Sequence, residues 1–128
     1  MSPSSPLSTA IVCWIGIDWA DQEHVISLKV TDGPTVERLR LRQQSEALQD
    51  WIGQLRQRFA GRPVAIALEQ SRGPLLYALM HTDFLYLYPI NPKSLARYRE
   101  AFYPSGAKDD PEDADLIREM VEKNPERF

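Results

Sequence analysis

The sequence predicts a single α/β domain built on a mixed β-sheet, and three observations support this prediction. The chain has 128 residues, of which 43% are hydrophobic, and this is enough for one domain with a buried core. Short apolar segments alternate with amphipathic ones along the chain. The apolar segment Val12–Ala20 (VCWIGIDWA) is rich in Ile and contains an acid near its end, which is typical of a central strand buried on both faces.

Two further strands are expected before the first helix. Residues 24–31 partly alternate in polarity, a turn signal follows at residues 32–34, and residues 35–42 alternate again, so a hairpin is predicted. The alternation shifts between Val36 and Leu39, which allows a β-bulge. The third strand carries arginines that either protect a sheet edge or contact phosphates, the first being favoured. These arginines are Arg38, Arg40 and Arg42.

Helices alternate with strands in the rest of the chain. Ser45 can cap a helix that runs to about Phe59 with its apolar side chains on one face. The expected elements that follow are a strand at 64–68 ended by Glu69, a short helix at 75–81 opened by Pro74, and a strand at 84–88. Asn91 is a natural N-cap for a helix that begins at Pro92 and ends near Phe102.

The last helix is expected to be capped by Asp109 or Asp110, with Pro111 in its first turn. Its expected apolar face consists of Leu116, Ile117, Met120 and Val121. Three antiparallel strands followed by strand–helix units match the ribonuclease H-like topology. This topology is a mixed five-stranded sheet with flanking helices, in which the first strand lies between the second and the fourth. Residues 1–10 are expected to form a disordered lead-in, and residues 11–128 the domain.

Composition excludes several classes of protein. The one cysteine, Cys13, excludes an internal disulfide and a multi-cysteine metal site, and a buried thiol fits a reducing, cytoplasmic compartment. No apolar run approaches the roughly 20 residues of a membrane span. The net charge is −3, but residues 37–62 and 92–108 are basic and the segment from Asp109 onward is acidic. This distribution suits a carboxylate metal site beside a phosphate backbone, although solvated helix faces explain it equally well.

Four acids are candidate metal ligands and catalytic residues: Asp18, Glu69, Asp110 and Asp113. Asp18 and Glu69 lie at the ends of two strands that are expected to be adjacent. Asp110 and Asp113 are three residues apart at the start of a helix. Mg²⁺ prefers such oxygen ligands, and a pair of ions can clamp both oxygens of a phosphoryl displacement. The alternative is that the last two acids only complement the helix dipole and that Glu69 is an ordinary strand end.

Other polar side chains carry weaker signals. The candidates for binding nucleic-acid phosphates are Arg72, Lys93, Arg97 and Lys108, with solvated surface as the favoured alternative for Arg72, Lys93 and Lys108. His24 and His81 lack metal-ligand spacing, so both are expected to be surface or hydrogen-bonded histidines.

Four motifs in order resemble a known family. GIDWA (16–20), ALEQSRG (67–73), YPINP (88–92) and KDDPEDADLI (108–117) resemble the N-terminal DEDD domain of bacterial insertion-sequence 110 type transposases, which are related to Piv-like DNA invertases. The resemblance implies a Holliday-junction-resolvase-like, ribonuclease H fold that holds Mg²⁺ or Mn²⁺, as two ions, on Asp18, Glu69, Asp110 and Asp113. It implies DNA as the substrate and a structured, element-encoded RNA as a partner. The family commonly has Lys-Thr-Asp before the last acid pair, and here Asp109 replaces the Thr.

The chain departs from this family in one respect. Family members are longer and carry a C-terminal domain with a serine nucleophile, and they are expected to act as homo-oligomers. We therefore expect a truncated product or an isolated domain, inactive alone, that contributes metal-dependent phosphoryl transfer on DNA during transposition. The alternatives are a non-catalytic nucleic-acid-binding or dimerisation module and a free-standing resolvase-like nuclease.

Overall fold

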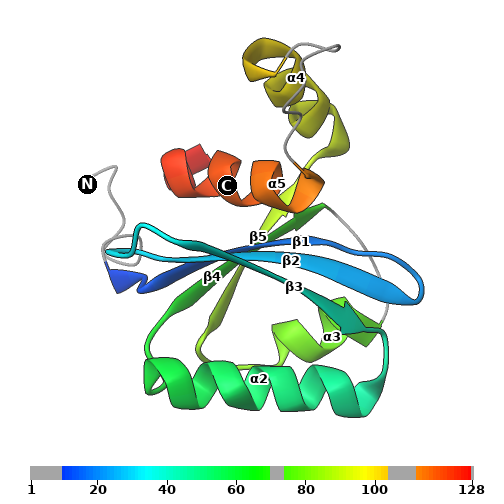
Figure 1. The fold of residues 1–128 in the computed structure, drawn as a ribbon, viewed down its shortest axis with the longest axis vertical. Coiled ribbons are helices and arrows are strands. Elements are labelled where there is room, and N and C mark those ends of the chain that lie inside the picture. Colours follow the sequence, from blue (N-terminus) through cyan, green and yellow to red (C-terminus); the bar gives the residue numbers. More distant parts are fainter. Residues whose placement is uncertain (1–9, 70–73, 104–111, 128) are drawn as a thin grey trace.

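The structure is a computed structural model that describes residues 10–69, 74–103 and 112–127 (Figure 1). Its sheet has the strand order β3-β2-β1-β4-β5. β2 pairs antiparallel with β1 and β3, whereas β1, β4 and β5 are parallel neighbours. The bounds are β1 Cys13–Asp18, β2 Glu23–Val30, β3 Val36–Arg42, β4 Val64–Glu69 and β5 Leu85–Ile90. This mixed five-stranded sheet, with the first strand between the second and fourth, confirms the predicted ribonuclease H-like α/β class.

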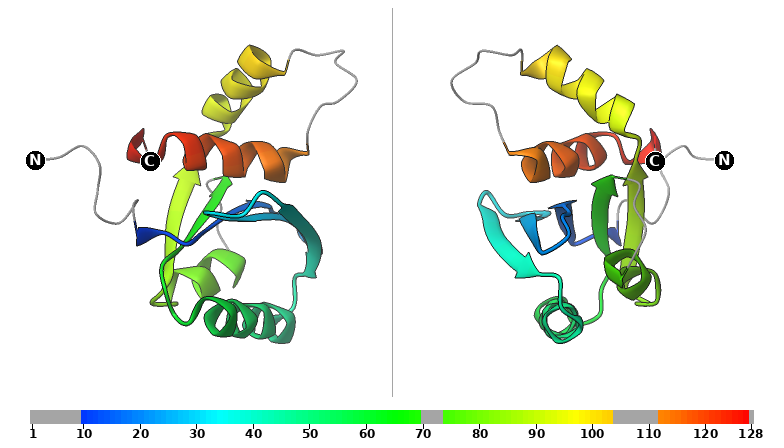
Figure 2. Two further views of the ribbon diagram at one scale, coloured as in Figure 1. Left: turned by 60° about the vertical axis from the view of Figure 1, so that its left-hand side comes forward. Right: turned by 90° about the vertical axis from the view of Figure 1, so that its right-hand side faces the viewer.

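Helices cover both faces of the sheet (Figures 1 and 2). α2 (Ser45–Phe59) and α3 (Pro74–Met80) pack on one face. α5 (Asp113–Lys123) lies across the other face, and α4 (Pro92–Phe102) extends from the sheet beyond it. A short 3-10 helix, η1 (Pro125–Arg127), follows α5. None of the helices in the described part of the chain is long and apolar enough to cross a membrane.

The two faces of the sheet have separate hydrophobic cores, and β1 contributes to both. Cys13, Ile15 and Ile17 belong to the core under α2 and α3, whereas Trp14 belongs to the core under α4 and α5. Burial on both faces is why β1 reads as a nearly continuous apolar run. The predicted apolar faces of α2 and α5 are confirmed as buried, as is the Cys13 thiol.

The β3 and β5 predictions need correction. The β2–β3 ladder is regular from Glu23↔Arg42 to Lys29↔Val36, so there is no bulge, and Val36 simply shares a face with the arginines. β5 continues past the predicted end to Ile90 and includes Pro89, which is tolerated because β5 is an edge strand.

Two helix starts were predicted wrongly, whereas the start of α3 at Pro74 and that of α4 at Pro92 were right. The N-cap of α2 is Gln44, in an extended conformation without a side-chain bond, so Ser45 is already helical. α5 begins at Asp113 with Glu112 as its N-cap, so neither of the predicted caps serves. The N-cap of α4 is Asn91 as predicted, and its Oδ1 accepts a hydrogen bond from the backbone N–H of Lys93 at 2.8 Å.

Candidate functional site

Strand alternation directs Asp18 and Glu69 to the same face of the sheet. Successive side chains of a strand point to opposite faces. Trp14 of β1 and Ala67 of β4 lie in the core under α5, so Asp18 and Glu69, which share their parity, point toward α5 as well. The pair Ile17↔Leu68 in the parallel β1–β4 ladder places the two acids side by side at the carboxyl ends of their strands.

Gly16 allows α5 to lie directly on β1. A Cβ atom at this position would be 2.2 Å from the backbone O of Ala114 and 2.6 Å from the backbone N of Arg118. Because no side chain fits into that space, only glycine permits this contact between strand and helix. The contact fixes the first turn of α5, and with it Asp113, over the end of β1 that carries Asp18.

The three described acids influence one another electrostatically. Burial raises the pKa of Asp18, and the neighbouring charges of Asp113 and Glu112 raise it further. Burial likewise raises the pKa of Glu69, with added repulsion from Asp113 and Asp18. The charged forms of Asp18 and Glu69 are thus disfavoured in the fold, and a bound cation would relieve that cost.

Asp113 has a partner that the sequence did not indicate. Arg99 of α4 donates a hydrogen bond to its carboxylate and forms an ion pair with it. Within residues 10–69, 74–103 and 112–127, no group of three or more His, Cys, Asp or Glu side chains is arranged so that it could hold a metal ion. The fourth predicted ligand, Asp110, lies outside the described residues. The metal-binding and catalytic roles of the four acids therefore stay predictions.

The donor set nevertheless fits a hard divalent cation. Carboxylate oxygens from β1, β4 and α5 are ligands that suit Mg²⁺ or Mn²⁺. Neither Asp18 nor Glu69 accepts a hydrogen bond or an ion pair from another described side chain, so their oxygens are available as ligands.

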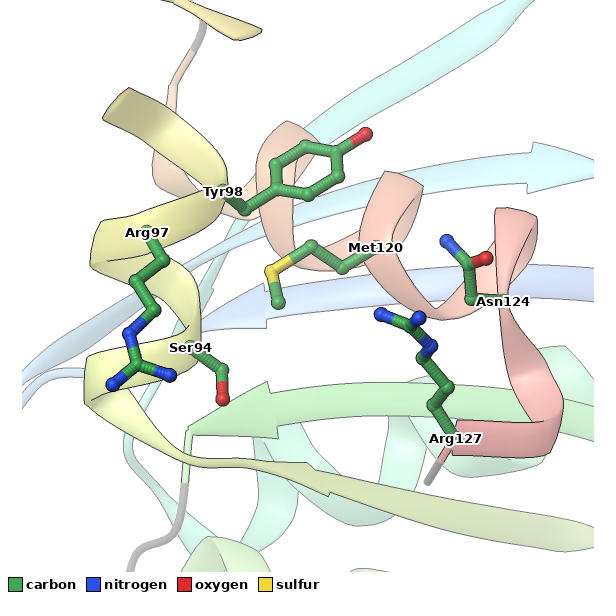
Figure 3. A pocket seen from close by; sticks show the side chains of 6 residues that line it. All are labelled: Ser94, Arg97, Tyr98, Met120, Asn124 and Arg127. Atoms are coloured by element: carbon green, nitrogen blue, oxygen red, sulfur yellow. The ribbon is translucent and has the colours of Figure 1, made fainter. Parts of the chain in front are cut away.

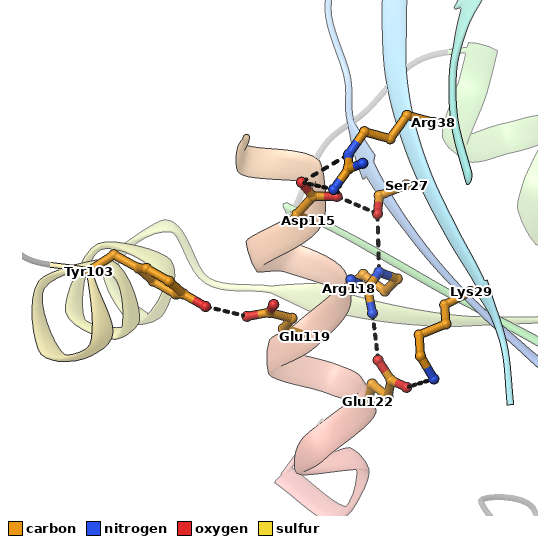
Figure 4. Close-up of polar contacts among 8 residues, drawn as sticks. All are labelled: Ser27, Lys29, Arg38, Tyr103, Asp115, Arg118, Glu119 and Glu122. Atoms are coloured by element: carbon orange, nitrogen blue, oxygen red, sulfur yellow. Dashed lines mark hydrogen bonds and ion pairs between the residues drawn. The ribbon is translucent and has the colours of Figure 1, made fainter. Parts of the chain in front are cut away.

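A buried polar network fixes α5 on the sheet (Figure 4). The Ser27 hydroxyl of β2 donates to Asp115 Oδ1 at 2.6 Å, and Arg118 Nε donates to Ser27 Oγ at 3.0 Å. Arg38 of β3 donates three further hydrogen bonds to Asp115, from Nε to both carboxylate oxygens at 3.2 Å and from Nη2 to Oδ2 at 3.0 Å. Asp115 and Arg118 are each only 5% exposed.

The network continues toward the C-terminal end of α5. Arg118 donates to Glu122 at 2.6 Å, and Lys29 Nζ lies 3.4 Å from the second Glu122 oxygen. Among the described residues, no buried side-chain nitrogen or oxygen lacks a partner. This network was not predicted from the sequence, although a serine within an apolar strand and charged residues beside the apolar face of a helix are signals for one. Arg38 is thus a structural residue here, whereas Arg40 pairs with Glu23 on the surface.

His24 holds the turn that follows Asp18. Its ring is 1% exposed, its Nδ1 accepts the backbone N–H of Ala20 at 3.0 Å, and its Nε2 lies 2.5 Å from Gln43 Oε1. The histidine is therefore hydrogen-bonded and structural, as predicted. His81 is exposed and bonds the carbonyl of Tyr77 at 2.8 Å.

Two of the four predicted phosphate-binding residues lie on α4, and the other two are not described. Lys93 and Arg97 are exposed on α4. Arg72 and Lys108 lie outside the described residues.

Comparison with known proteins shows that the chain is similar to transposases. A family profile described as "Transposase", of the DEDD insertion-sequence 110 type, matches residues 15–128. The chain is 30% identical over 119 residues to "Putative transposase y4uE" of Sinorhizobium fredii, covering 91% of this chain and 33% of that protein. It is 29% identical over 114 residues to "Mini-circle putative transposase for IS117" of Streptomyces coelicolor, covering 88% of this chain and 27% of that protein. The chain thus spans a third or less of the length of these relatives.

Proposed function

Because the chain belongs to the insertion-sequence 110 type DEDD transposase family, we propose that it carries the metal-dependent site for phosphoryl transfer on DNA during transposition. The supporting observation is the convergence of Asp18, Glu69 and the first turn of α5 at one edge of the sheet. Open α/β sheets bind their ligands at the carboxyl ends of their parallel strands, which here are β1, β4 and β5. Asp110 is proposed to complete the set.

The residues have distinct proposed tasks. Asp18, Glu69, Asp110 and Asp113 would hold Mg²⁺ or Mn²⁺, as two ions. When bound, the metal supplies Lewis-acid polarisation of a phosphodiester oxygen. Arg99 positions Asp113 through its ion pair and neutralises part of the acidic charge at the start of α5. Gly16 and the Asp115 network hold α5 against the sheet, so that Asp113 keeps its position.

The activity of a whole transposase is a wider proposal. The stretch that this chain matches makes up 33% of one of the relatives named above and 27% of the other. A second domain with a serine nucleophile, a structured RNA partner and homo-oligomers are what the family resemblance implies for the full assembly. We propose DNA as the substrate that all of these share.

The experiment is a metal titration followed by thermal unfolding. We expect Mg²⁺ or Mn²⁺ to raise the Tm of the wild-type chain, because ions that bind only the folded state stabilise it. Asp18→Asn should raise the metal-free Tm, since the pKa of Asp18 is raised by burial and by neighbouring acids, and it should abolish the response to metal. Asp83→Asn is the matched control, because Asp83 is exposed and pairs with Arg56 at 3.1 Å.

The outcomes separate the proposal from its alternative. A wild-type Tm that does not respond to either ion, or an Asp18→Asn variant that responds fully, would contradict the metal site. A non-catalytic nucleic-acid-binding module would then be favoured, and one observation supports it: Arg99 already neutralises Asp113. Metal-dependent nicking of DNA by the chain alone would instead favour a free-standing nuclease.

A further inference from the structure

A polar groove lies between α4 and the C-terminal end of α5 (Figure 3). Its volume is about 390 Å³. Ser94, Arg97 and Tyr98 come from α4, and Met120, Asn124 and Arg127 come from α5 and the residues after it. In Figure 3, Met120 lies between the two arginines, so the groove has an apolar floor and a cation at each side.

The two arginines of the groove differ from most arginines of the described chain. Arg97 and Arg127 form no ion pair with any described residue, and none of the described residues that line the groove is acidic. Six other described arginines do form ion pairs: Arg38, Arg40, Arg56, Arg58, Arg99 and Arg118. Two guanidinium groups without counter-charges at one groove make a site for an anion with several oxygens, because each guanidinium presents a fork of donors.

The neighbouring groups favour the same ligand. The Ser94 hydroxyl and the Asn124 amide add hydrogen-bond donors at the groove. Ser94 lies in the first turn of α4, where the helix dipole attracts an anion. Tyr98 stacks on Phe102 with ring centroids 4.7 Å apart, and Phe102 is 65% exposed. Tyr98 is partly buried, so Phe102, one turn further along α4, is the exposed ring on which a base of a nucleic-acid strand can stack.

We propose that this groove binds the phosphodiester backbone of a nucleic acid at a distance from the carboxylates. Met120 and Asn124 follow Asp113 by seven and eleven positions, so at a rise of about 1.5 Å per residue they lie about 10 and 16 Å along α5 from it. At about 3.4 Å per step this separation corresponds to about three to five nucleotides. The groove therefore holds the strand beside the reacting phosphate, and the inference rests on the proposed function for the identity of the polymer.

The test is a binding titration in EDTA, which removes divalent ions and so makes the result independent of the carboxylates. Fluorescein-labelled single-stranded DNA, duplex DNA and RNA of one sequence are the probes, and anisotropy is recorded over a series of salt concentrations. The variants are Arg97→Ala, Arg127→Ala and the double variant. Arg56→Ala on α2 is the matched control, because it removes the same charge from the opposite face of the sheet.

We expect the double variant to bind about tenfold more weakly, and the salt dependence of log K to fall by about 0.7 per arginine on single strands or about 0.9 on duplex. Arg56→Ala should leave both quantities unchanged, and circular dichroism should show all variants folded. The probe that loses most affinity identifies which nucleic acid the groove prefers.

Three results would overturn the proposal. In the first, the wild-type chain binds none of the probes. In the second, Arg56→Ala weakens binding as much as the double variant does. In the third, inorganic phosphate competes fully with the probes, which would indicate a site for the free anion. Failure of the proposed function looks different. In that case Asp18→Asn leaves the response of the Tm to Mg²⁺ or Mn²⁺ unchanged, while the double variant of Arg97 and Arg127 still binds nucleic acid more weakly.

Discussion

Replacing Gly16 by alanine tests the contact on which the carboxylate site depends. The added Cβ atom would lie 2.2 Å from Ala114 O, 2.6 Å from Arg118 N and 2.9 Å from Arg118 Cβ. Reaching even a tight contact requires α5 to move by about 1 Å away from β1. The two closest atoms belong to the helix backbone, so truncating side chains on α5 should not rescue the variant.

The expected cost follows from the overpacking. Inserting a methyl group into a well-packed core typically costs about 1–3 kcal/mol, and the backbone contacts place Gly16→Ala at the upper end, about 3 kcal/mol. For a chain of this size that corresponds to a fall in Tm of about 10 °C. Urea and thermal unfolding followed by circular dichroism measure both quantities.

Gly53→Ala is the matched control for this substitution. Gly53 is exposed within α2, and a Cβ atom there would meet nothing within 4 Å. An alanine in a helix is favoured over glycine by about 0.5–1 kcal/mol, so this variant should gain stability where the other loses it. If Gly16→Ala proves as stable as the wild type, the direct packing of α5 on β1 is wrong, and the placement of Asp113 over Asp18 falls with it.

Three further predictions concern other parts of the fold. Asp115→Ala should lower the free energy of unfolding by about 1–3 kcal/mol, because the buried Ser27 hydroxyl and the Arg38 guanidinium lose their shared acceptor. Arg40→Ala removes only an exposed ion pair and should change the free energy of unfolding by less than about 0.5 kcal/mol. If urea unfolding shows equal losses for Asp115→Ala and Arg40→Ala, the structural role of the network is wrong. Burial raises the pKa of Cys13 to about 12 from 9.0, so the thiol of the folded chain should resist Ellman's reagent at pH 8 and react only on unfolding. Since the thiol ionises at lower pH in the unfolded chain, the free energy of unfolding should be intact below pH 9 and fall as the pH rises from there toward 12. Rapid labelling of the native chain would refute the burial of the thiol. Asn91→Ala should cost about 1 kcal/mol by removing the cap of α4, whereas Gln44→Ala, at an N-cap without a side-chain bond, should cost almost nothing in the same thermal assay.

Local chemistry determined the elements, and for that reason the sequence alone predicted most of them. The period of the apolar side chains in α2, the Asn91-Pro92 cap and the continuous apolar run of β1 each depend on neighbours within a few positions. The errors in the strands occurred where a neighbour in space decides. β5 could include Pro89 because it is an edge strand, and the β2–β3 ladder fixed the register of Val36.

By itself, the sequence determined the fold class, the family motifs and which acids are strand ends. Only the tertiary structure decided what those acids meet, because side chains 51 or 95 positions apart, such as Asp18 with Glu69 and Asp113, come together through sheet register and helix packing. The Arg99 pair with Asp113, the Asp115 network and the groove at Arg97 and Arg127 each join separate elements. No periodicity encodes such contacts, since they depend on how closely α5 approaches the sheet, and Gly16 sets that distance.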